Sequence, residues 1–334
     1  MLTRRRFLTI TAASAALATA PSARAAVPRV EWRGTALGAE ALLRLDHPDE
    51  ALAWRLIADC LAELERLEGV FSLCRPDSAL CRLNRGGALE APPLDLVVLL
   101  TEAKRYGDLS GGAFDITVQP LWELHARHFA AADADPAGPP EDRVAAARTL
   151  VDYRQVRVAP DRIAFERPGM AVTLNGIAQG YITDRLADRL RAAGLTHVLA
   201  DFGEVRALGP QWDGRPWRIG LEDPMEPGRI AATMPIQDGA VATSGGYGTR
   251  FSPLCHHIFD PATGHSANGV VAVTVRAPTA TLADALSTAL AVLPPEHAQE
   301  FLERCPGVGA WITIPPNKTV VYGGAMIDER RAGP

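Results

Sequence analysis

Two oxygen-bearing side chains near the end of the chain could together hold a hard cation. Asp284 and Thr288 stand four residues apart within residues 279–293, an apolar stretch that predicts a helix. Side chains four residues apart lie on one helix face, so the carboxylate and the hydroxyl would face the same space. Mg²⁺ prefers such oxygen ligands. Taken alone, the pattern fits more simply a solvent-facing aspartate beside a threonine that bonds back to its own helix.

Histidines supply a second candidate, because an imidazole can exchange a proton near neutral pH. His256 and His257 are adjacent and precede a turn sequence at residues 261–264. They could be metal ligands, an acid or base, or a structural pair, but neighbours on a strand point to opposite faces and would not serve one centre together. His125 and His128 form another pair. No glutamate stands between them as in a zinc protease helix, so we interpret them as surface residues.

Residues 171–207 contain the most informative predicted elements. The sequence predicts a strand at 172–174 and a glycine turn at 175–180. A helix follows, with an apolar stripe of Ile182, Leu186 and Leu190 and a cap at Gly194, and then a strand at 198–200. The N-terminus of such a helix favours anions, because its N–H groups and dipole face the turn. Glycine at such a turn often serves geometry alone, so the layout by itself is weak evidence for phosphate binding.

Further elements are predicted on either side of this segment. They are a strand pair within 32–45, a helix opened by Pro48, a helix at 94–106, a surface loop at 130–142, and a hairpin made of 156–158 and 163–165.

The composition is typical of a globular protein with a large core, since the 334 residues are 47% hydrophobic and 22% charged. A net charge of −5 argues against nucleic acid as a partner, because nucleic-acid binding usually needs a basic surplus. The five cysteines form no CxxC motif, so neither a zinc knuckle nor a redox pair is indicated. We expect most of them to be small buried apolar residues.

The first 25 residues differ from the rest of the chain. Without their four arginines the net charge falls from −5 to −9. Arg4, Arg5 and Arg6 precede an apolar run at 7–20 and a small-residue cleavage pattern at 22–25. This order predicts a twin-arginine (Tat) signal peptide at 1–25 and a periplasmic mature protein at 26–334. The apolar run is too short to span a bilayer, and no later segment has 18 uninterrupted apolar residues, so we expect no stable membrane insertion of the mature chain.

Six motifs, in order and over nearly the whole mature chain, resemble those of the ApbE family of FAD:protein FMN transferases. They are FS with RPDS and RLN within 71–84, GGAFD with TV and PL within 111–121, NGIAQG at 175–180, ATSG at 242–245, HIFDP at 257–261 and ADALSTAL at 283–290. No single motif is decisive, but six in the right order are specific. The resemblance therefore favours the functional interpretation of Asp284, Thr288 and His257 over the simpler ones.

Two departures from the family pattern fall in the turn at 175–180. Asn175 replaces the first glycine of the motif, and Gln179 replaces its usual lysine. The substitution by Gln179 removes a cation from the expected neighbourhood of the diphosphate. The wording NGIAQGY resembles the NosX subgroup, which is linked to nitrous oxide respiration.

The resemblance implies an α+β fold of mixed sheets with packed helices and a flavin cleft between two lobes. It implies that FAD is cleaved at its diphosphate, that the FMN half is transferred through a phosphoester bond to a Thr or Ser hydroxyl of an acceptor protein, and that AMP leaves. For the NosX subgroup the implied acceptor is the flavin domain of the membrane-bound protein NosR. Mg²⁺ is the implied cofactor, because it neutralises phosphate charge and stabilises the leaving group.

The resemblance also implies a role for individual residues. Asp284, Thr288 and the backbone carbonyl of Ala178 would hold Mg²⁺, and His257 would be the general base. The implied flavin contacts are Cys74, Ala113, Phe114, Asp115, Asn175, Tyr181 and Ile258. Two other functions stay open: a protein that binds and delivers FAD without catalysis, and a pyrophosphatase in which water replaces the acceptor hydroxyl.

Overall fold

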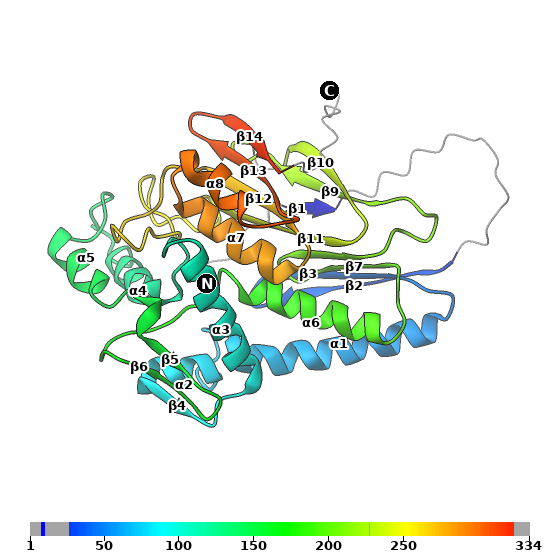
Figure 1. The fold of residues 1–334 in the computed structure, drawn as a ribbon, viewed down its shortest axis with the longest axis horizontal. Coiled ribbons are helices and arrows are strands. Elements are labelled where there is room, and N and C mark those ends of the chain that lie inside the picture. The colour runs from blue at the N-terminus through cyan, green and yellow to red at the C-terminus, as the bar shows by residue number, and fades with distance from the viewer. Residues whose placement is uncertain (1–7, 11–26, 227, 324–334) are drawn as a thin grey trace.

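The computed structural model describes residues 8–10, 27–226 and 228–323 (Figure 1). The signal peptide predicted at 1–25 therefore lies outside the described residues, apart from strand β1 (Leu8–Ile10), which pairs antiparallel with β9 (Trp217–Glu222). No helix within the described ranges is long and apolar enough to cross a membrane.

An eight-stranded sheet forms the centre of the fold, and neighbouring strands in it pair antiparallel. Its spatial order is β14 (Lys318–Tyr322), β13 (Gly309–Ile314), β12 (Ala272–Ala277), β11 (Gly239–Gly245), β8 (Val205–Leu208), β7 (Val198–Asp201), β3 (Ala39–Asp46) and β2 (Arg29–Ala36). The strand pair predicted within 32–45 is confirmed as β2 and β3. A central sheet with packed helices confirms the predicted α+β class.

The central sheet buries both of its faces. Helices α1 (Glu50–Phe71), α6 (Ala178–Ala192) and α7 (Ala280–Val292) pack on one face, and in Figure 1 α1 and α6 run beneath β2, β3 and β7. The hairpin of β9 and β10 (Ile230–Ile236) packs on the other. Along β7, Val198 and Ala200 belong to the helix-side core and Leu199 to the hairpin-side core. One sheet therefore connects both cores.

The helices on this sheet begin and pack as their sequences predict. Asp49 caps α1 and Thr279 caps α7, each by accepting a backbone N–H three residues later. The helix predicted at 279–293 is thus confirmed as α7. The buried stripe predicted for α6 is fully buried: Ile182, Leu186 and Leu190.

A second group of shorter elements surrounds the ends of these helices. They are α2 (Ala79–Gly86), β4 (Ala88–Glu90), α3 (Leu94–Leu109), η1 (Ile116–Val118), α4 (Gln119–His128), α5 (Glu141–Arg148), η2 (Tyr153–Gln155), β5 (Val156–Val158), β6 (Arg162–Phe165), η3 (Pro295–His297) and α8 (Ala298–Glu303). The helix predicted at 94–106 is confirmed as α3, and the predicted hairpin as β5 and β6. The loop predicted at 130–142 is confirmed except for its last two residues, which begin α5.

The strand predicted at 172–174 is wrong, because these described residues join no sheet. The side chain of Asn84 takes the place of a neighbouring strand. Its Nδ2 donates to the carbonyl of Val172 at 2.8 Å, and its Oδ1 accepts the N–H of Val172 at 2.8 Å. The N–H of Thr173 donates to the carbonyl of Ile116 at 2.8 Å. This extended segment therefore pairs with no strand, because its backbone N–H and carbonyl groups bond to the Asn84 side chain and to Ile116 instead.

The surface position predicted for His125 is also wrong. The ring is buried, its Nδ1 lies 2.9 Å from the carbonyl of Leu121, and its centroid lies 4.6 Å from that of Phe259. Burial lowers the pKa of His125, which favours the neutral ring. The aromatic partners Phe251 and Phe259 come from a distant part of the chain, so no local pattern around His125 indicates its burial.

The cysteines follow the expectation that most are buried. Cys60, Cys255 and Cys305 are buried, and burial raises the pKa of Cys60 to about 12. Cys74 is exposed and Cys81 half-buried, and all five are unpaired thiols.

Candidate active site

Two of the predicted metal ligands meet where α6 and α7 pack against each other in opposite directions. Asp284 is 3% exposed, and its Oδ2 accepts the N–H of Gly180 at 3.0 Å. Gly176 lies just before α6, where an added Cβ would come within 2.8 Å of the Thr288 hydroxyl oxygen. Ala178, the first residue of α6, stands between these two contacts in the sequence. We call this meeting point of Ala178, Asp284 and Thr288 the α6–α7 junction.

Two serines that the sequence analysis did not assign lie at this junction. The Oγ of Ser244, near the end of β11, is 3.3 Å from the Thr288 hydroxyl and 2.8 Å from that of Ser287. The hydroxyl of Ser287 also donates to the carbonyl of Asp284 at 2.9 Å. Ser244 lies in the motif ATSG and Ser287 in ADALSTAL, so the motifs that carry the family resemblance could have identified both serines.

The spacing of α6 and α7 depends on one glycine and one carboxylate. A Cβ on Gly180 would lie 2.3 Å from the carbonyl oxygen of Ala280, so only glycine permits this approach. Asp184 accepts the N–H groups of Ala280 and Thr281 at 2.9 and 2.8 Å and the Thr281 hydroxyl at 2.7 Å. A side chain of α6 thus caps α7, while burial raises the pKa of Asp184.

The two adjacent histidines have different environments, as their alternation predicts. His256 is buried, its Nε2 lies 3.1 Å from the carbonyl of Ala267, and its Nδ1 accepts the N–H of Ile258 at 3.3 Å. Both ring nitrogens are therefore used, and burial lowers the pKa of His256 to about 4. His257 is half-buried, and its Nδ1 lies 3.1 Å from the carbonyl of Thr249. His256 is structural, which leaves His257 as the candidate base.

The loop after β11 connects His257 to the predicted metal ligands. A Cβ on Gly248 would lie 3.3 Å from the His257 ring, so this loop passes directly beside it. The same loop begins after Ser244, whose hydroxyl contacts Thr288. His257 and the α6–α7 junction therefore flank the same end of β11.

The predicted flavin contacts are spread over several segments. Asn175 is exposed in the turn that leads into α6, and Ile258 is buried directly after His257, so both adjoin the residues described above. Cys74 is exposed just after α1, and Ala113 is half-buried after α3. Phe114 is buried in the helix-side core. Their contacts with flavin stay predictions.

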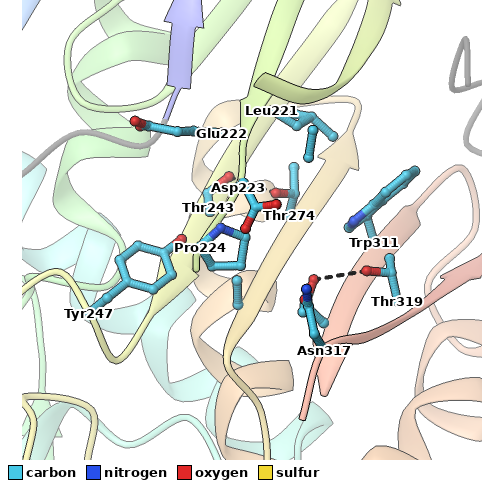
Figure 2. A pocket seen from close by; sticks show the side chains of 13 residues that line it. Leu221, Glu222, Asp223, Pro224, Thr243, Tyr247, Thr274, Trp311, Asn317 and Thr319 are labelled. Atoms are coloured by element: carbon cyan, nitrogen blue, oxygen red, sulfur yellow. Dashed lines mark hydrogen bonds between the residues drawn. The ribbon is translucent and has the colours of Figure 1, made fainter. Parts of the chain in front are cut away.

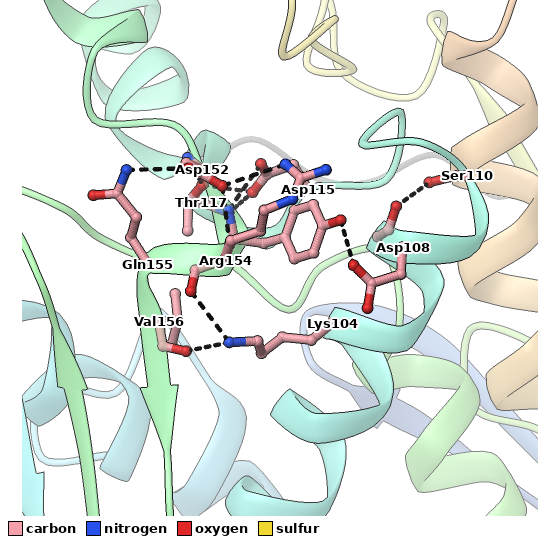
Figure 3. A network of polar contacts seen from close by, with 11 residues as sticks. Lys104, Asp108, Ser110, Asp115, Thr117, Asp152, Arg154, Gln155 and Val156 are labelled. Atoms are coloured by element: carbon pink, nitrogen blue, oxygen red, sulfur yellow. Dashed lines mark hydrogen bonds and ion pairs between the residues drawn. The ribbon is translucent and has the colours of Figure 1, made fainter.

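Asp115 lies in a polar network between α3, η1 and η2 (Figure 3). Its Oδ1 accepts the N–H and the hydroxyl of Thr117 at 2.7 and 2.5 Å, and its Oδ2 accepts the N–H of Tyr153 at 3.1 Å. The Tyr153 hydroxyl in turn donates to Asp108 at 2.7 Å. Burial raises the pKa of Asp115. Both carboxylate oxygens of Asp115 therefore accept hydrogen bonds from within the protein.

Tyr181 contacts the helices on the other side of α6. Its hydroxyl donates to Asp95 of α3 at 2.7 Å, and its ring packs edge-on against Phe71 at a centroid distance of 5.6 Å. Asp95 also pairs with Arg66 at 2.8 Å. This hydroxyl is part of an ion-pair network that joins α1, α3 and α6.

The donor set of the α6–α7 junction fits Mg²⁺. It offers a carboxylate, a hydroxyl and a backbone carbonyl, all of them oxygen donors, and Mg²⁺ usually fills its other positions with phosphate and water. Within the described ranges, no group of three or more His, Cys, Asp or Glu side chains is placed to hold a metal. A site rich in imidazole or thiolate, as softer metals prefer, is therefore not offered there.

A polar cavity lies on the opposite face of the central sheet (Figure 2). Thr243 lines it beside Thr274 at 2.8 Å, whereas the next residue, Ser244, faces α7. Its volume of about 50 Å³ has room for a few water molecules and not for a flavin nucleotide. The cavity is therefore separate from the α6–α7 junction.

The fold matches solved flavin transferase structures over most of its length. The flavin transferase ApbE from Vibrio cholerae gives a TM-score of 0.76 at 28% identity, covering 89% of this chain and 97% of that one. The apo form of the Pseudomonas stutzeri flavinyl transferase ApbE gives a TM-score of 0.74 at 28% identity, covering 89% and 94%. The chain therefore has the fold of the flavin transferases.

Sequence comparison assigns a family within this class. The ApbE family model matches residues 34–312. The FAD:protein FMN transferase of Treponema pallidum is 34% identical over 295 residues, covering 80% of this chain and 79% of that protein. Its counterpart from Klebsiella pneumoniae is 32% identical over 290 residues, covering 82% and 78%. The chain belongs to the ApbE family, as the motifs predict.

Proposed function

We propose that this chain is a Mg²⁺-dependent FAD:protein FMN transferase. It cleaves FAD at the diphosphate, links the FMN half through a phosphoester bond to a Thr or Ser hydroxyl of an acceptor protein, and releases AMP. The observation that supports this most directly is the meeting of Asp284 with the first turn of α6. A hydroxyl reaches an anionic diphosphate only when the phosphate charge is neutralised, and this junction supplies oxygen donors for the neutralising cation.

The residues of the junction would hold the metal. When bound, Mg²⁺ neutralises the phosphate charge and stabilises the leaving group. Asp284 contributes the charged ligand, Thr288 a hydroxyl and Ala178 its carbonyl. Ser244, 3.3 Å from the Thr288 hydroxyl, and Ser287, 2.8 Å from Ser244, orient that hydroxyl through hydrogen bonds.

His257 acts as the base that takes the proton of the acceptor hydroxyl. A carbonyl can only accept, so the contact of Nδ1 with the carbonyl of Thr249 assigns the proton of the neutral ring to Nδ1. Nε2 is then the nitrogen that can receive a proton. The backbone of Thr249 thereby sets both the tautomer and the orientation of the ring.

Phosphate binding relies on the metal and on the backbone at the start of α6. Gln179 is neutral and buried, so it adds no charge at this point. Ile177, the N-cap of α6, makes no side-chain capping bond. The N–H groups of Ala178 and Tyr181 donate to backbone carbonyls and that of Gly180 to Asp284, so the start of the helix attracts an anion mainly through the helix dipole.

The proposal extends to location and acceptor. The twin-arginine pattern at 1–25 supports export to the periplasm, and the NosX-like wording at 175–181 supports the NosR flavin domain as acceptor. The test is co-expression with the periplasmic domain of NosR, followed by a denaturing gel read for covalent flavin fluorescence. We expect a fluorescent acceptor band that requires Mg²⁺.

The same experiment separates the alternatives. FMN and AMP formed without acceptor labelling would indicate a pyrophosphatase, and FAD that stays bound and intact would indicate a delivery protein. Either result would refute the transferase proposal for this pair of proteins. An alanine variant of the labelled serine or threonine is the control, and it should remove the fluorescent band because the acceptor hydroxyl is gone.

A further inference from the structure

The segment that carries His257 is held in place from outside the α6–α7 junction. Residues 249–257 form a short hairpin, which we call the His257 hairpin, and in it the N–H of His257 donates to the carbonyl of Thr249 at 3.1 Å. The same carbonyl oxygen lies 3.1 Å from Nδ1 of the His257 ring. One atom of Thr249 thus orients both the backbone and the ring of His257. The direction of the ring therefore depends on where the strand around Thr249 places that carbonyl.

Phe251, two residues after Thr249, anchors the His257 hairpin to α4. Its half-buried ring stacks on that of Phe129, with the centroids 5.7 Å apart and the planes 10° from parallel. The Phe251 ring also lies edge-on to Trp122 at 6.2 Å and 6.1 Å from the ring of His125. Aromatic rings prefer such offset and edge-on arrangements, so the four rings together define one position for the hairpin on α4.

The tip of the His257 hairpin is attached a second time, to the loop that follows α4. The hydroxyl of Ser252 donates to the carbonyl of Pro136 at 2.7 Å, and the thiol of Cys255 donates to that of Ala137 at 3.5 Å. Gly138 has a φ of +114°, and a Cβ there would lie 3.3 Å from the Cys255 sulfur. This loop therefore packs closely on the hairpin that carries the candidate base.

The anchoring contacts belong to a small hydrophobic core that differs from the core of α6 and α7. Leu121 of α4, Val144 of α5 and Phe259 are its buried members. Phe251 packs against them. The proposed metal ligands belong to α6 and α7, whose buried apolar residues lie in the helix-side core. A change in the small core can therefore move the candidate base without moving the metal ligands.

We propose that Phe251 is a positioning residue for His257, and this inference rests on the proposed role of His257 as the base. By holding the hairpin against α4, the Phe251 ring keeps the Thr249 carbonyl within hydrogen-bond distance of Nδ1. That contact keeps the proton of the neutral imidazole on Nδ1, so Nε2 is the nitrogen that takes the proton of the acceptor hydroxyl. With a smaller side chain at position 251 the hairpin can shift, and the ring loses this fixed tautomer while the α6–α7 junction stays in place.

The test is nitrogen NMR of the histidine rings in the full chain at pH 8, without FAD or metal. Signals absent from His257→Asn are those of His257, and in the parent they should show the proton on Nδ1. Phe251→Ala should lose this signature, and Phe251→Tyr, which keeps the ring, should retain it. Phe251→Leu, a milder truncation, makes the same comparison if the alanine variant does not fold.

Phe301→Ala is the matched control, because it removes the same side chain from a buried position of α8 in the helix-side core. It should lower the Tm but leave the His257 signals as they are in the parent. An unchanged tautomer in Phe251→Ala would overturn the proposal. Loss of the tautomer in Phe301→Ala would also overturn it, because the signals would then report a general loosening of the fold.

Transfer kinetics separate a positioning role from a purely structural one. Phe251→Ala should lower kcat by about tenfold or more and leave the KM for FAD unchanged, since the metal ligands do not move. A raised KM with an unchanged kcat would contradict the proposal. A parent chain that transfers no FMN would instead refute the proposed function. The NMR comparison needs no activity and would still test whether Phe251 positions His257.

Discussion

At the scale of single residues, the proposed chemistry depends most on the charge of Asp284. Asp284→Asn keeps the shape of the side chain, and its amide oxygen can still accept the N–H of Gly180, but the charge that attracts Mg²⁺ is lost. We expect transfer to fall by roughly a hundredfold or more, as for the loss of one stabilising group in an active site. Thermal melts with and without Mg²⁺ give a second measurement, and the metal should no longer raise the Tm.

Asp133→Asn is the matched control, because it removes the same charge from an exposed loop. It should keep both full transfer and the response of the Tm to Mg²⁺. Full activity of Asp284→Asn would contradict the assignment of this carboxylate to the metal.

His256 makes the stability of the fold depend on pH. Its pKa is lowered from 6.5 to about 4 in the folded chain, so between these values the unfolded chain binds a proton that the folded chain does not. Stability is therefore complete above about pH 6.5 and decreases as the pH falls toward 4, by about 3 kcal/mol from this residue. His256→Phe, although less stable at pH 7, should lose correspondingly less over this range.

Urea unfolding at pH 7, 5 and 4 measures the difference between the two chains. His297→Asn, at an exposed position, is the control and should follow the parent. If His256→Phe loses as much stability as the parent on acidification, the buried neutral ring is not the cause. His125, whose pKa is also lowered by burial, contributes equally to both chains.

The sequence predicted some of these residue positions and not others, for a physical reason. The four-residue spacing of Asp284 and Thr288 and the alternation of His256 and His257 are local, so a helix or an extended segment determines them directly. The capping of α7 by Asp184 joins residues 96 and 97 positions apart. No local pattern encodes such a contact, and only the packed helices show it.

At the scale of elements, the approach of α6 to α7 determines the geometry of the proposed metal site. Gly180→Ala would place a Cβ 2.3 Å from the carbonyl oxygen of Ala280, and the helices must separate to accept it. We expect a loss of about 1–3 kcal/mol in the free energy of unfolding. Mg²⁺ should also bind more weakly, because Asp284 and Ala178 move apart with their helices. Urea unfolding and metal titration followed by Tm measure the two effects.

Gly69→Ala gives the contrasting substitution in α1. A Cβ there meets no atom within 4 Å, so alanine should stabilise the helix by about 0.5–1 kcal/mol. A loss of stability at both positions would mean that something other than the α6–α7 contact makes alanine unfavourable in these helices.

Some helices and strands could be predicted from local sequence patterns and others could not. The apolar stripe of α6 and the capping of α7 by Thr279 are local, and both helices are found where the sequence predicts them. The strand predicted at 172–174 is wrong because hydrophobicity alone does not show what pairs with a segment. Its backbone partner is the amide of Asn84, 88 residues earlier.

At the scale of the whole molecule, the order of strands could not be predicted from the sequence. β3 pairs with β2, its neighbour in sequence, but also with β7, more than 150 residues later, through Leu43 and Ala200. These two strands meet only in the folded chain, where the two cores pack on opposite faces of the same sheet. The same packing places the end of β11 beside α7 and His257.

Because the two cores share one sheet, we expect the chain to unfold as a single cooperative unit. Ile219→Ala on β9 empties space in the hairpin-side core and should cost about 2–5 kcal/mol. Amides of α6, in the helix-side core, should then lose as much protection from hydrogen exchange as those of β9. Val321→Ala, at an exposed position of β14, should leave protection in both regions unchanged. Loss confined to β9 and β10 would instead show that the hairpin opens separately from the α6–α7 junction.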